Sequence, residues 1–319
     1  MTHRPYSLML HGGALTPSTP LRTEALAARL DSLHAILEQG REILVRGGSA
    51  LRAVEYCACR LEDDPLFNAG RGSVLNADGA IEMDAAIMDG RDLAAGAVAA
   101  IRRIANPVAL ARQVMRHSGH VLLAGAGAAR YARQQGIPRV AAAALVTAAR
   151  LQQYRSADPG DGSESPTGTI GAVACDKRGN LAAATSTGGV ARKRAGRIGD
   201  SALVGAGVYA DNLSCAVSAT GRGEDFIRTV LAKYIADRIE LLGEDAARAA
   251  QAGIEQLQRR VAGHGGVIVI DANGRCASRF TPGGMLHGWI EHGGPARCSW
   301  NGVPPCGVPR ADATGGIGR

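Results

Sequence analysis

The chain has 319 residues, of which 46% are hydrophobic and only 3% are aromatic. A chain of this size and composition can bury a sizeable core, but alanine and glycine must do much of the filling. No apolar run is long enough to cross a membrane, and the first residues lack the hydrophobic stretch and cleavage site of a secretory signal. We therefore expect a cytoplasmic protein with no membrane partner.

The net charge of +7 is carried almost wholly by arginine, because the chain contains only three lysines. A basic protein can bind nucleic acid, but here the arginines are dispersed and few aromatic side chains could stack on bases. We expect no nucleic-acid partner. The densest basic run, Arg192-Lys193-Arg194, is interpreted as a solvated loop.

The seven cysteines are scattered and odd in number, so reduced thiols are favoured over a disulfide framework. Cys57 and Cys59 have the wrong spacing for a zinc knuckle, and no His/Cys pair completes such a site. We interpret both as buried filler.

In chain order, the first half is expected to form a strand, two helices and a hairpin. A short apolar strand covers residues 6–10 and runs into His11-Gly12-Gly13. Helical periodicity extends from about Arg22 to Val45, and Ser49 can cap a second helix that ends near Leu61.

An Asp89-Gly90 step between two alternating segments indicates a β-hairpin. The β-like runs before it are residues 73–75 and 81–88, with a turn at 76–79 between them. Two further helices are expected at 108–116 and 128–135.

From about residue 152 to residue 168, the sequence is rich in serine, glycine, proline and aspartate. Such a segment cannot bury enough apolar surface to order itself. We interpret it as a flexible linker that ends abruptly at Gly168-Thr169, where a strongly β-like pattern begins.

Beyond Thr169, strands are grouped with strands and helices with helices, which favours stacked layers over a βαβ repeat. The tail from about residue 295 is rich in glycine and proline and is expected to be poorly ordered. The predicted elements are strands at 170–175, 181–187, 214–219 and 267–270, helices at 224–241 and 244–261, and a last hairpin through Gly274.

The Gly168-Thr169 junction has the residue types that self-cleavage needs. Glycine gives the backbone room for a strained conformation, so the Thr169 hydroxyl could attack the preceding carbonyl and form an ester that water hydrolyses. The product would begin with Thr169, whose new α-amino group has a reference pKa of about 7.7–8.0 and could serve as base. From these two residues alone, the alternative that Thr169 merely begins a strand is favoured.

Motifs on both sides of the junction reverse that balance. After it come Gly168–Ala174, Thr185–Gly189, Gly196–Ser201 and Thr220–Glu224, and before it come His11–Ala14, Leu66–Gly70 and Met83–Gly90. In this order and spacing, they resemble the plant-type (type III) L-asparaginase/isoaspartyl peptidase family of the N-terminal-nucleophile hydrolase superfamily. The resemblance covers roughly residues 6–290.

The resemblance implies an α+β fold, a four-layer αββα sandwich. It also implies a single domain, 1–319, that cuts itself into an α subunit, 1–168, and a β subunit, 169–319. The cleaved protein would hydrolyse L-asparagine and β-aspartyl (isoaspartyl) dipeptides and release L-aspartate.

Thr169 would be the nucleophile of this reaction. Thr187 lies on the partner strand, where its hydroxyl can bind the Thr169 amine or hydroxyl, whereas Thr185 is interpreted as strand packing. A hydroxyl and an N–H at a helix start suit a developing oxyanion. By resemblance, this role falls to Thr220 and Gly221, and Gly223 lines the pocket.

Arg197 and Asp200 are expected to bind the substrate zwitterion. A guanidinium binds the α-carboxylate bidentately and a carboxylate binds the α-ammonium, while the side-chain amide faces Thr169. Outside this motif, an arginine and an aspartate three residues apart would be interpreted as a surface salt bridge. Asn68 is expected to help position water or the substrate.

The chemistry needs no cofactor, but the resemblance implies a structural sodium ion and a homodimer of cleaved αβ protomers. Carbonyl ligands leave no side-chain signature, so the residues themselves neither support nor oppose the ion. The main-chain carbonyls that would hold it belong to Leu61, Glu62, Asp64, Phe67, Ala69 and Arg71.

The chain departs from the family pattern beside the substrate-binding residues. Arg192–Ala195 replaces a less charged stretch that ends in proline, Ser201-Ala202 replaces the frequent Ser-Pro, and Thr167 stands where histidine is common. These differences bear on substrate preference and cleavage rate more than on the core chemistry.

Of three alternatives, two stay open, and the dinucleotide-binding fingerprint fails. A glycosylasparaginase-like hydrolase of the same superfamily would typically have aspartate before the nucleophile and asparagine in place of Gly188. Dinucleotide binding through Gly125-Ala126-Gly127 lacks the third glycine and an acidic residue about twenty positions further on. An uncleaved, catalytically dead scaffold would persist as one full-length band in denaturing electrophoresis.

Overall fold

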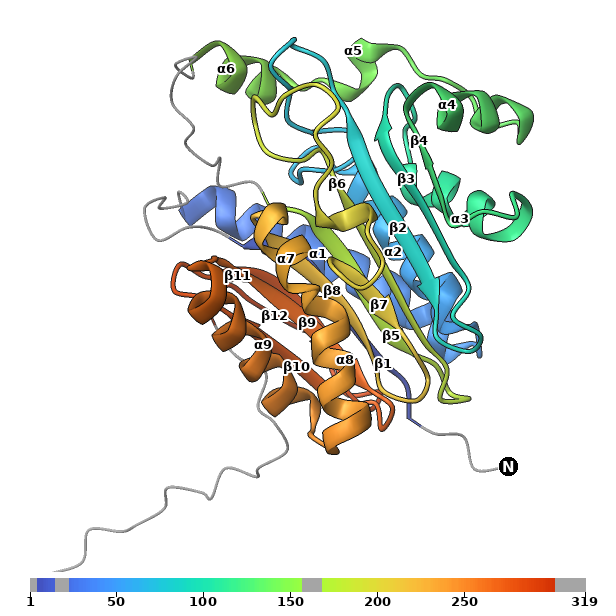
Figure 1. Ribbon diagram of the computed structural model, residues 1–319, viewed down its shortest axis with the longest axis vertical. Coiled ribbons are helices and arrows are strands. Elements are labelled where there is room, and N and C mark those ends of the chain that lie inside the picture. The colour runs from blue at the N-terminus through green and yellow to red at the C-terminus, as the bar shows by residue number, and fades with distance from the viewer. Residues whose placement is uncertain (1–4, 15–22, 157–167, 302–319) are drawn as a thin grey trace, which may run out of the picture.

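The computed structural model describes residues 5–14, 23–156 and 168–301. Its strands are β1 Ser7–Ala14, β2 Met83–Asp89, β3 Ala95–Ile101, β4 Leu122–Ala124, β5 Ile170–Cys175, β6 Leu181–Thr187, β7 Val208–Ala210, β8 Cys215–Gly221, β9 Gly265–Asp271, β10 Cys276–Phe280, β11 Met285–Ile290 and β12 Arg297–Ser299. They form an eight-stranded sheet of order β12-β11-β1-β5-β6-β2-β3-β4 and a four-stranded sheet of order β10-β9-β8-β7. The two sheets lie face to face, and helices cover the outer face of each (Figure 1). The predicted four-layer αββα sandwich is confirmed.

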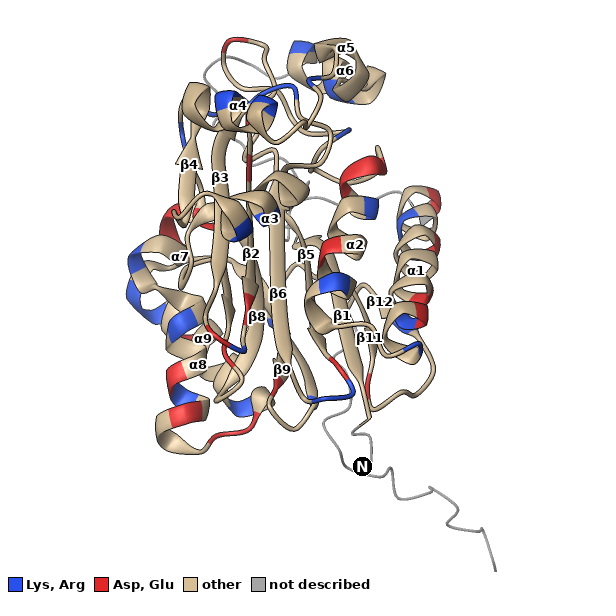
Figure 2. Ribbon diagram, turned by 90° about the vertical axis from the view of Figure 1, so that its right-hand side faces the viewer, with Lys and Arg blue, Asp and Glu red and all other residues tan. Residues whose placement is uncertain are grey.

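The central strands of the large sheet are buried on both faces. All residues of β5 and β6 are buried, and both strands consist largely of small apolar residues. Continuous apolar runs are typical of strands that are covered on both sides. Charged residues lie mainly on the helices and loops of the outside, whereas most strand positions carry none (Figure 2).

Three helices, α1 Thr23–Val45, α2 Ala50–Asp63 and α3 Pro107–His117, pack against the large sheet. The predicted cap of α2 is confirmed, because the Ser49 hydroxyl accepts a hydrogen bond from the Arg52 N–H at 3.3 Å. Asp176, which follows β5, accepts a further bond from the Ala50 N–H at 3.2 Å. The start of α2 is therefore fixed to the far end of β5.

The helix predicted at 224–241 is instead two helices, α7 Gly223–Thr229 and α8 Leu231–Leu242. They meet at Val230, whose φ of 48° is left-handed and whose N–H bonds to the Ile227 carbonyl at 3.2 Å. Helix periodicity alone does not reveal a one-residue break of this kind. Together, α8 and α9, Ala246–Val261, cover the outer face of the small sheet (Figure 1).

Three predictions are corrected. The prediction of a linker from residue 152 is wrong for residues 152–156, because α6, Ala148–Ser156, is helical and the Arg150 side chain bonds to the Gly72 carbonyl. The tail predicted from residue 295 contains β12, which pairs with the open edge of β11. The β-like run at 73–75 is a loop. Residues 157–167 and 302–319 lie outside the described part of the chain.

The hairpin predicted at Asp89-Gly90 is confirmed as the β2–β3 turn. The remaining helices are α4 Gly125–Gln134 and α5 Ala142–Leu145. The Gly125-Ala126-Gly127 segment thus forms the first turn of α4, at the edge of the large sheet. No helix among the described residues has the length and apolar character needed to span a membrane.

Candidate active site

Thr169 immediately precedes β5, and only 6% of its surface is exposed. Ile170 pairs with Ser186 in the sheet register, so Thr169 lies level with Thr187 at the end of β6. Thr187 in turn pairs with Asp84 of β2. Because neighbouring strands are about 4.8 Å apart, the three residues form a row roughly 10 Å long. The sheet thus brings the predicted nucleophile level with its predicted hydroxyl partner.

This row faces the small sheet. Thr185 lies two residues before Thr187, hence on the same face of β6. Its hydroxyl donates to the Gly207 carbonyl at 3.2 Å and lies 2.7 Å from Ser218 Oγ on β8. The Thr185 side chain therefore joins the two sheets, in agreement with the packing role inferred from the sequence.

A buried histidine extends this polar network beneath the start of β5. His11 Nε2 lies 2.9 Å from Ser218 Oγ, and burial lowers the pKa of His11 to about 3, so its ring is neutral. Gly171 passes so close that a Cβ there would overlap both side chains. His11 lies in one of the motifs, but the motif predicts no role for it. The available signal was a single histidine at the end of an apolar strand.

Gly168 is packed so closely that no side chain fits. A Cβ at this position would lie 2.6 Å from the Gly13 Cα atom and 2.8 Å from Thr220 Oγ1. Gly13 itself has a φ of 114°, a conformation that favours glycine. This close approach brings the Thr220 hydroxyl against the peptide that joins Gly168 to Thr169.

Thr220 and Gly221 end β8 beside this peptide. Thr220 is fully buried, and its Oγ1 accepts a hydrogen bond from the Ala14 N–H at 3.2 Å. A hydroxyl both accepts and donates, so the Thr220 proton is still available for donation. A donor fixed in a buried position suits negative charge that develops on a carbonyl oxygen.

The turn after β6 fixes the Thr187 side chain, whose Oγ1 accepts from the Gly189 N–H at 2.9 Å. Asn68 supports the same turn. Its Nδ2 donates to the Gly189 carbonyl at 2.7 Å, and its Oδ1 accepts from the Val74 N–H at 2.9 Å. With 1% of its surface exposed, Asn68 contacts this turn; its predicted direct contact with water or substrate stays a prediction.

Arg197, Asp200 and Gly223 converge where α7 begins. A Cβ on Gly223 would lie 2.9 Å from Arg197 Nη2 and 2.9 Å from the Asp200 backbone nitrogen, so this position needs glycine. The Nε and Nη2 groups of Arg197 donate to the Glu224 carboxylate at 2.9 and 2.8 Å. Glu224 lies in one of the motifs, but the motif does not predict that its carboxylate orients the guanidinium.

Asp200 is buried, and its Oδ2 makes no hydrogen bond within the described residues. Burial raises the pKa of Asp200 to about 7, assisted by the negative charges of Asp84 and Glu224 and opposed by Arg197. A cation placed beside Oδ2 would favour the ionised form. The carboxyl is therefore suited to bind an ammonium group.

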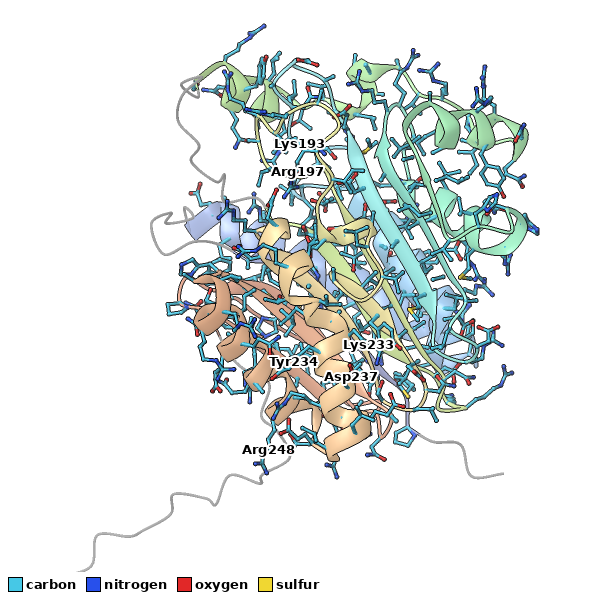
Figure 3. The ribbon with its side chains drawn as sticks, viewed as in Figure 1. Lys193, Arg197, Lys233, Tyr234, Asp237 and Arg248 are labelled. Carbon is cyan, nitrogen blue, oxygen red and sulfur yellow. The ribbon has the colours of Figure 1, made fainter. Side chains whose placement is uncertain are left out.

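The interpretation of Arg192-Lys193-Arg194 as a solvated loop is wrong for Lys193. Its side chain is 1% exposed, and its Nζ lies 3.8 Å from Asp84 Oδ2. Figure 3 shows Lys193 near Arg197, at the end of the molecule where β6 terminates. A run of three basic residues gives no signal for which one turns inward, because the partner carboxylate comes from a distant strand.

The predicted sodium loop brings carbonyl oxygens together around two glycines. A Cβ on Gly72 would lie 2.6 Å from the Pro65 oxygen and 2.7 Å from the Phe67 oxygen. Gly70 and Gly72 have φ values of 50° and 95°, conformations that favour glycine. Hard cations take oxygen ligands, so a loop of this kind fits an ion held by carbonyls. No cluster of three or more His, Cys, Asp or Glu side chains suited to a metal occurs in the described residues.

The layers and the site define the class of the protein. A four-layer αββα sandwich with a buried threonine at the start of a central strand is the α+β fold of the N-terminal-nucleophile hydrolases.

A family model described as asparaginase matches residues 4–298. The chain is 43% identical over 291 residues to the isoaspartyl peptidase/L-asparaginase of Rattus norvegicus. The aligned region covers 90% of this chain and 86% of the relative. It is 44% identical over 294 residues to the isoaspartyl peptidase of Salmonella typhimurium, covering 88% of this chain and 94% of the relative. The human isoaspartyl peptidase/L-asparaginase is 42% identical to the chain over 283 residues, and the aligned region covers 87% of this chain and 91% of the relative. The chain belongs to the asparaginase family.

Proposed function

We propose that this protein is an autoprocessing threonine amidohydrolase that releases L-aspartate from L-asparagine and from β-aspartyl dipeptides. The proposal depends on one observation: Thr169 is buried at the start of β5, and Gly168 is pressed against Gly13 and the Thr220 hydroxyl. The relatives support the substrate classes, because their names are isoaspartyl peptidase or L-asparaginase.

The first reaction is the cleavage of the chain itself. Thr169 Oγ1 attacks the Gly168 carbonyl carbon, and the hydroxyl proton passes to the Thr169 nitrogen as the C–N bond breaks. The resulting ester is hydrolysed by water. Residues 1–168 then end in a carboxylate, and residues 169–319 begin with a free α-amino group. The Thr220 hydroxyl stabilises the negative charge on the Gly168 carbonyl oxygen.

The second reaction uses that amino group as the base. It accepts the Thr169 hydroxyl proton while Oγ1 attacks the side-chain carbonyl carbon of the substrate. Ammonia leaves from asparagine, or the amino group of the second residue leaves from a β-aspartyl dipeptide, and the leaving nitrogen takes up the proton. Water then hydrolyses the acyl-enzyme. Thr187 orients Thr169, and Thr220 and Gly221 stabilise the oxyanion.

Arg197 and Asp200 hold the substrate for this attack. Of the five N–H donors of the Arg197 guanidinium, Glu224 engages one on Nε and one on Nη2, so the other three can bind the substrate α-carboxylate. The α-ammonium binds to Asp200 Oδ2. Gly223 lets both residues pack against the start of α7, because a Cβ there would overlap the Arg197 guanidinium and the Asp200 backbone.

Three expectations that accompany this function are proposed with it. The carbonyls of Leu61, Glu62, Asp64, Phe67, Ala69 and Arg71 would hold a structural sodium ion, which stiffens the turn around Asn68. Two cleaved αβ protomers would form a homodimer, and the enzyme would work in the cytoplasm on small substrates. Sedimentation analysis and a comparison of melting temperatures in sodium and choline buffers would test the dimer and the ion.

Denaturing electrophoresis and an ammonia assay test the central proposal. The wild-type protein should give two bands and release ammonia from L-asparagine, whereas Thr169→Ala should give one band and release none. Thr169→Ser keeps a hydroxyl and should still cleave. A glycosylated asparagine, assayed in parallel, would reveal a glycosylasparaginase. Active material in which mass spectrometry still finds residues 168 and 169 joined would contradict the mechanism.

A further inference from the structure

The loop at residues 188–200, here called the substrate loop, leads from β6 to the short 3-10 turn Asp200–Ala202 and carries Arg197. It reverses direction at Arg192, whose φ of 56° is unusual for a residue with a side chain. A left-handed conformation of this kind persists where the surroundings fix it. The Arg192 N–H bonds to the Leu75 carbonyl at 2.8 Å, so the turn is tied to the loop of residues 71–82.

On its outer side, the substrate loop is fastened to α6 by the Arg192 side chain. Nη2 of Arg192 donates to the Tyr154 carbonyl at 2.5 Å, and the guanidinium carbon lies 4.6 Å from the centre of the Tyr154 ring. The Tyr154 hydroxyl donates to the Ala77 carbonyl at 3.0 Å, and Arg150 Nε donates to the Gly72 carbonyl at 2.6 Å. Polar contacts of Arg150 and Tyr154 therefore hold helix α6 against the rest of the fold.

On its inner side, the loop is fastened to the large sheet by Lys193. Its Nζ lies 3.8 Å from Asp84 Oδ2 and makes no hydrogen bond within the described residues. The same Asp84 oxygen accepts from the Gly199 N–H at 3.3 Å, directly before Asp200. At the other end of the loop, a Cβ on Gly189 would lie 2.9 Å from Lys193 Nζ. Lys193 Nζ thus lies close to Gly189, near the start of the loop, and to Asp84, which also binds Gly199 near the end of the loop.

We propose that Arg192 and Lys193 form a two-sided anchor that positions Arg197 and Asp200, and so sets substrate affinity without touching the substrate. This inference rests on the proposed substrate-binding role of those two residues. If the chain is cut before Thr169, Tyr154 belongs to the α subunit and Arg192 to the β subunit. The outer contact then spans the two products of cleavage, and affinity depends on the docking of α6.

Steady-state kinetics on L-asparagine test the anchor. In Arg192→Gly, the glycine relaxes the turn and removes the contact with Tyr154. KM should therefore rise about tenfold while kcat changes by less than about twofold. Tyr154→Leu should raise KM through the same contact, and the double variant should be no worse than the more affected single variant. Arg194→Ala is the matched control, because Arg194 is exposed in the same run, and its KM should equal that of the wild type.

The inner contact is tested by Lys193→Met and Lys193→Arg, each checked for complete cleavage and for its melting temperature. The methionine variant should raise KM, and the arginine variant, which keeps the charge, should restore part of the affinity. An unchanged KM in Arg192→Gly and Tyr154→Leu would overturn the anchor, as would a loss of kcat with KM unchanged. Failure of the proposed function would be seen separately, as a wild-type protein that releases no ammonia.

Discussion

Burial raises the pKa of Asp200, and under the proposed function this pKa sets the pH range in which the substrate binds. With a pKa of about 7, this carboxyl is mostly protonated at about pH 6 and mostly ionised at about pH 8. An α-ammonium group binds the ionised form, so the KM for asparagine should fall up to tenfold as the pH rises across about these two units. Initial rates measured across this interval would check the slope.

Asp200→Asn provides the comparison for this titration. The amide has no titratable proton and no negative charge, so its KM should exceed the wild-type KM at every pH and should not vary across the interval. A wild-type KM that is constant with pH would show that Asp200 is ionised throughout, contrary to its burial and to the nearby Asp84 and Glu224 carboxylates.

Some residues of the site can be predicted from short sequence motifs, and others cannot because their partners are distant in sequence. Thr169, Thr187 and Thr220 could be predicted from motifs in a fixed order, and the register then places Thr169 level with Thr187. The burial of Lys193 could not be predicted, because its partner Asp84 lies on a strand more than a hundred residues away. His11 likewise acquires its contact only when β1 and β8 come together.

Between elements, the junction of α7 and α8 stores backbone strain. Val230 has a φ and a ψ of 48°, and a left-handed conformation costs a side-chain residue about 1–2 kcal/mol. Val230 is 49% exposed, so its replacement loses little packing. Val230→Gly should therefore raise the free energy of unfolding by about 1 kcal/mol and the melting temperature by about 2–3 °C, as measured by calorimetry.

Leu241→Gly is the matched substitution in regular helix, since Leu241 lies in α8 and is 72% exposed. Here glycine loses helix propensity without relieving strain, so this variant should be less stable than the wild type. If both glycine variants lowered the melting temperature, Val230 would not be strained.

The ends of helices and strands can be predicted from the sequence where neighbouring residues determine them. The Ser49 cap and the Asp89-Gly90 turn are formed by neighbours in sequence, and both were predicted. Helix α6 and strand β12 were missed because their order comes from partners elsewhere, such as the Gly72 carbonyl under Arg150 and the edge of β11. Composition indicates whether a segment can order itself, not whether another part of the fold orders it.

Across the whole molecule, the two parts on either side of Thr169 interleave within one sheet. Strand β1 of the N-terminal part lies between β5 and β11 of the C-terminal part, and β2 pairs with β6. Backbone hydrogen bonds in all of these strand pairs therefore join the segment before Thr169 to the segment after it. Without β1, the facing edges of β5 and β11 would leave N–H and C=O groups unpaired in the buried centre of the sheet.

Cleavage before Thr169 is therefore expected to leave both segments in one particle. The wild type should elute as a single peak in native size-exclusion chromatography, although denaturing electrophoresis separates two bands. After separation in denaturant, each segment diluted alone should fail to recover its far-ultraviolet circular dichroism, whereas the mixture should recover it together with ammonia release.

The uncleaved Thr169→Ala protein shows how much protein refolds when the two segments need not associate. At low concentration its refolding yield should exceed that of the mixture, because its sheet forms within one chain. A C-terminal segment that regained native circular dichroism alone would show that β5 and β11 do not need β1 between them. Such a result would contradict the interdependence of the two segments, because β1 supplies the central hydrogen-bond partners of both strands.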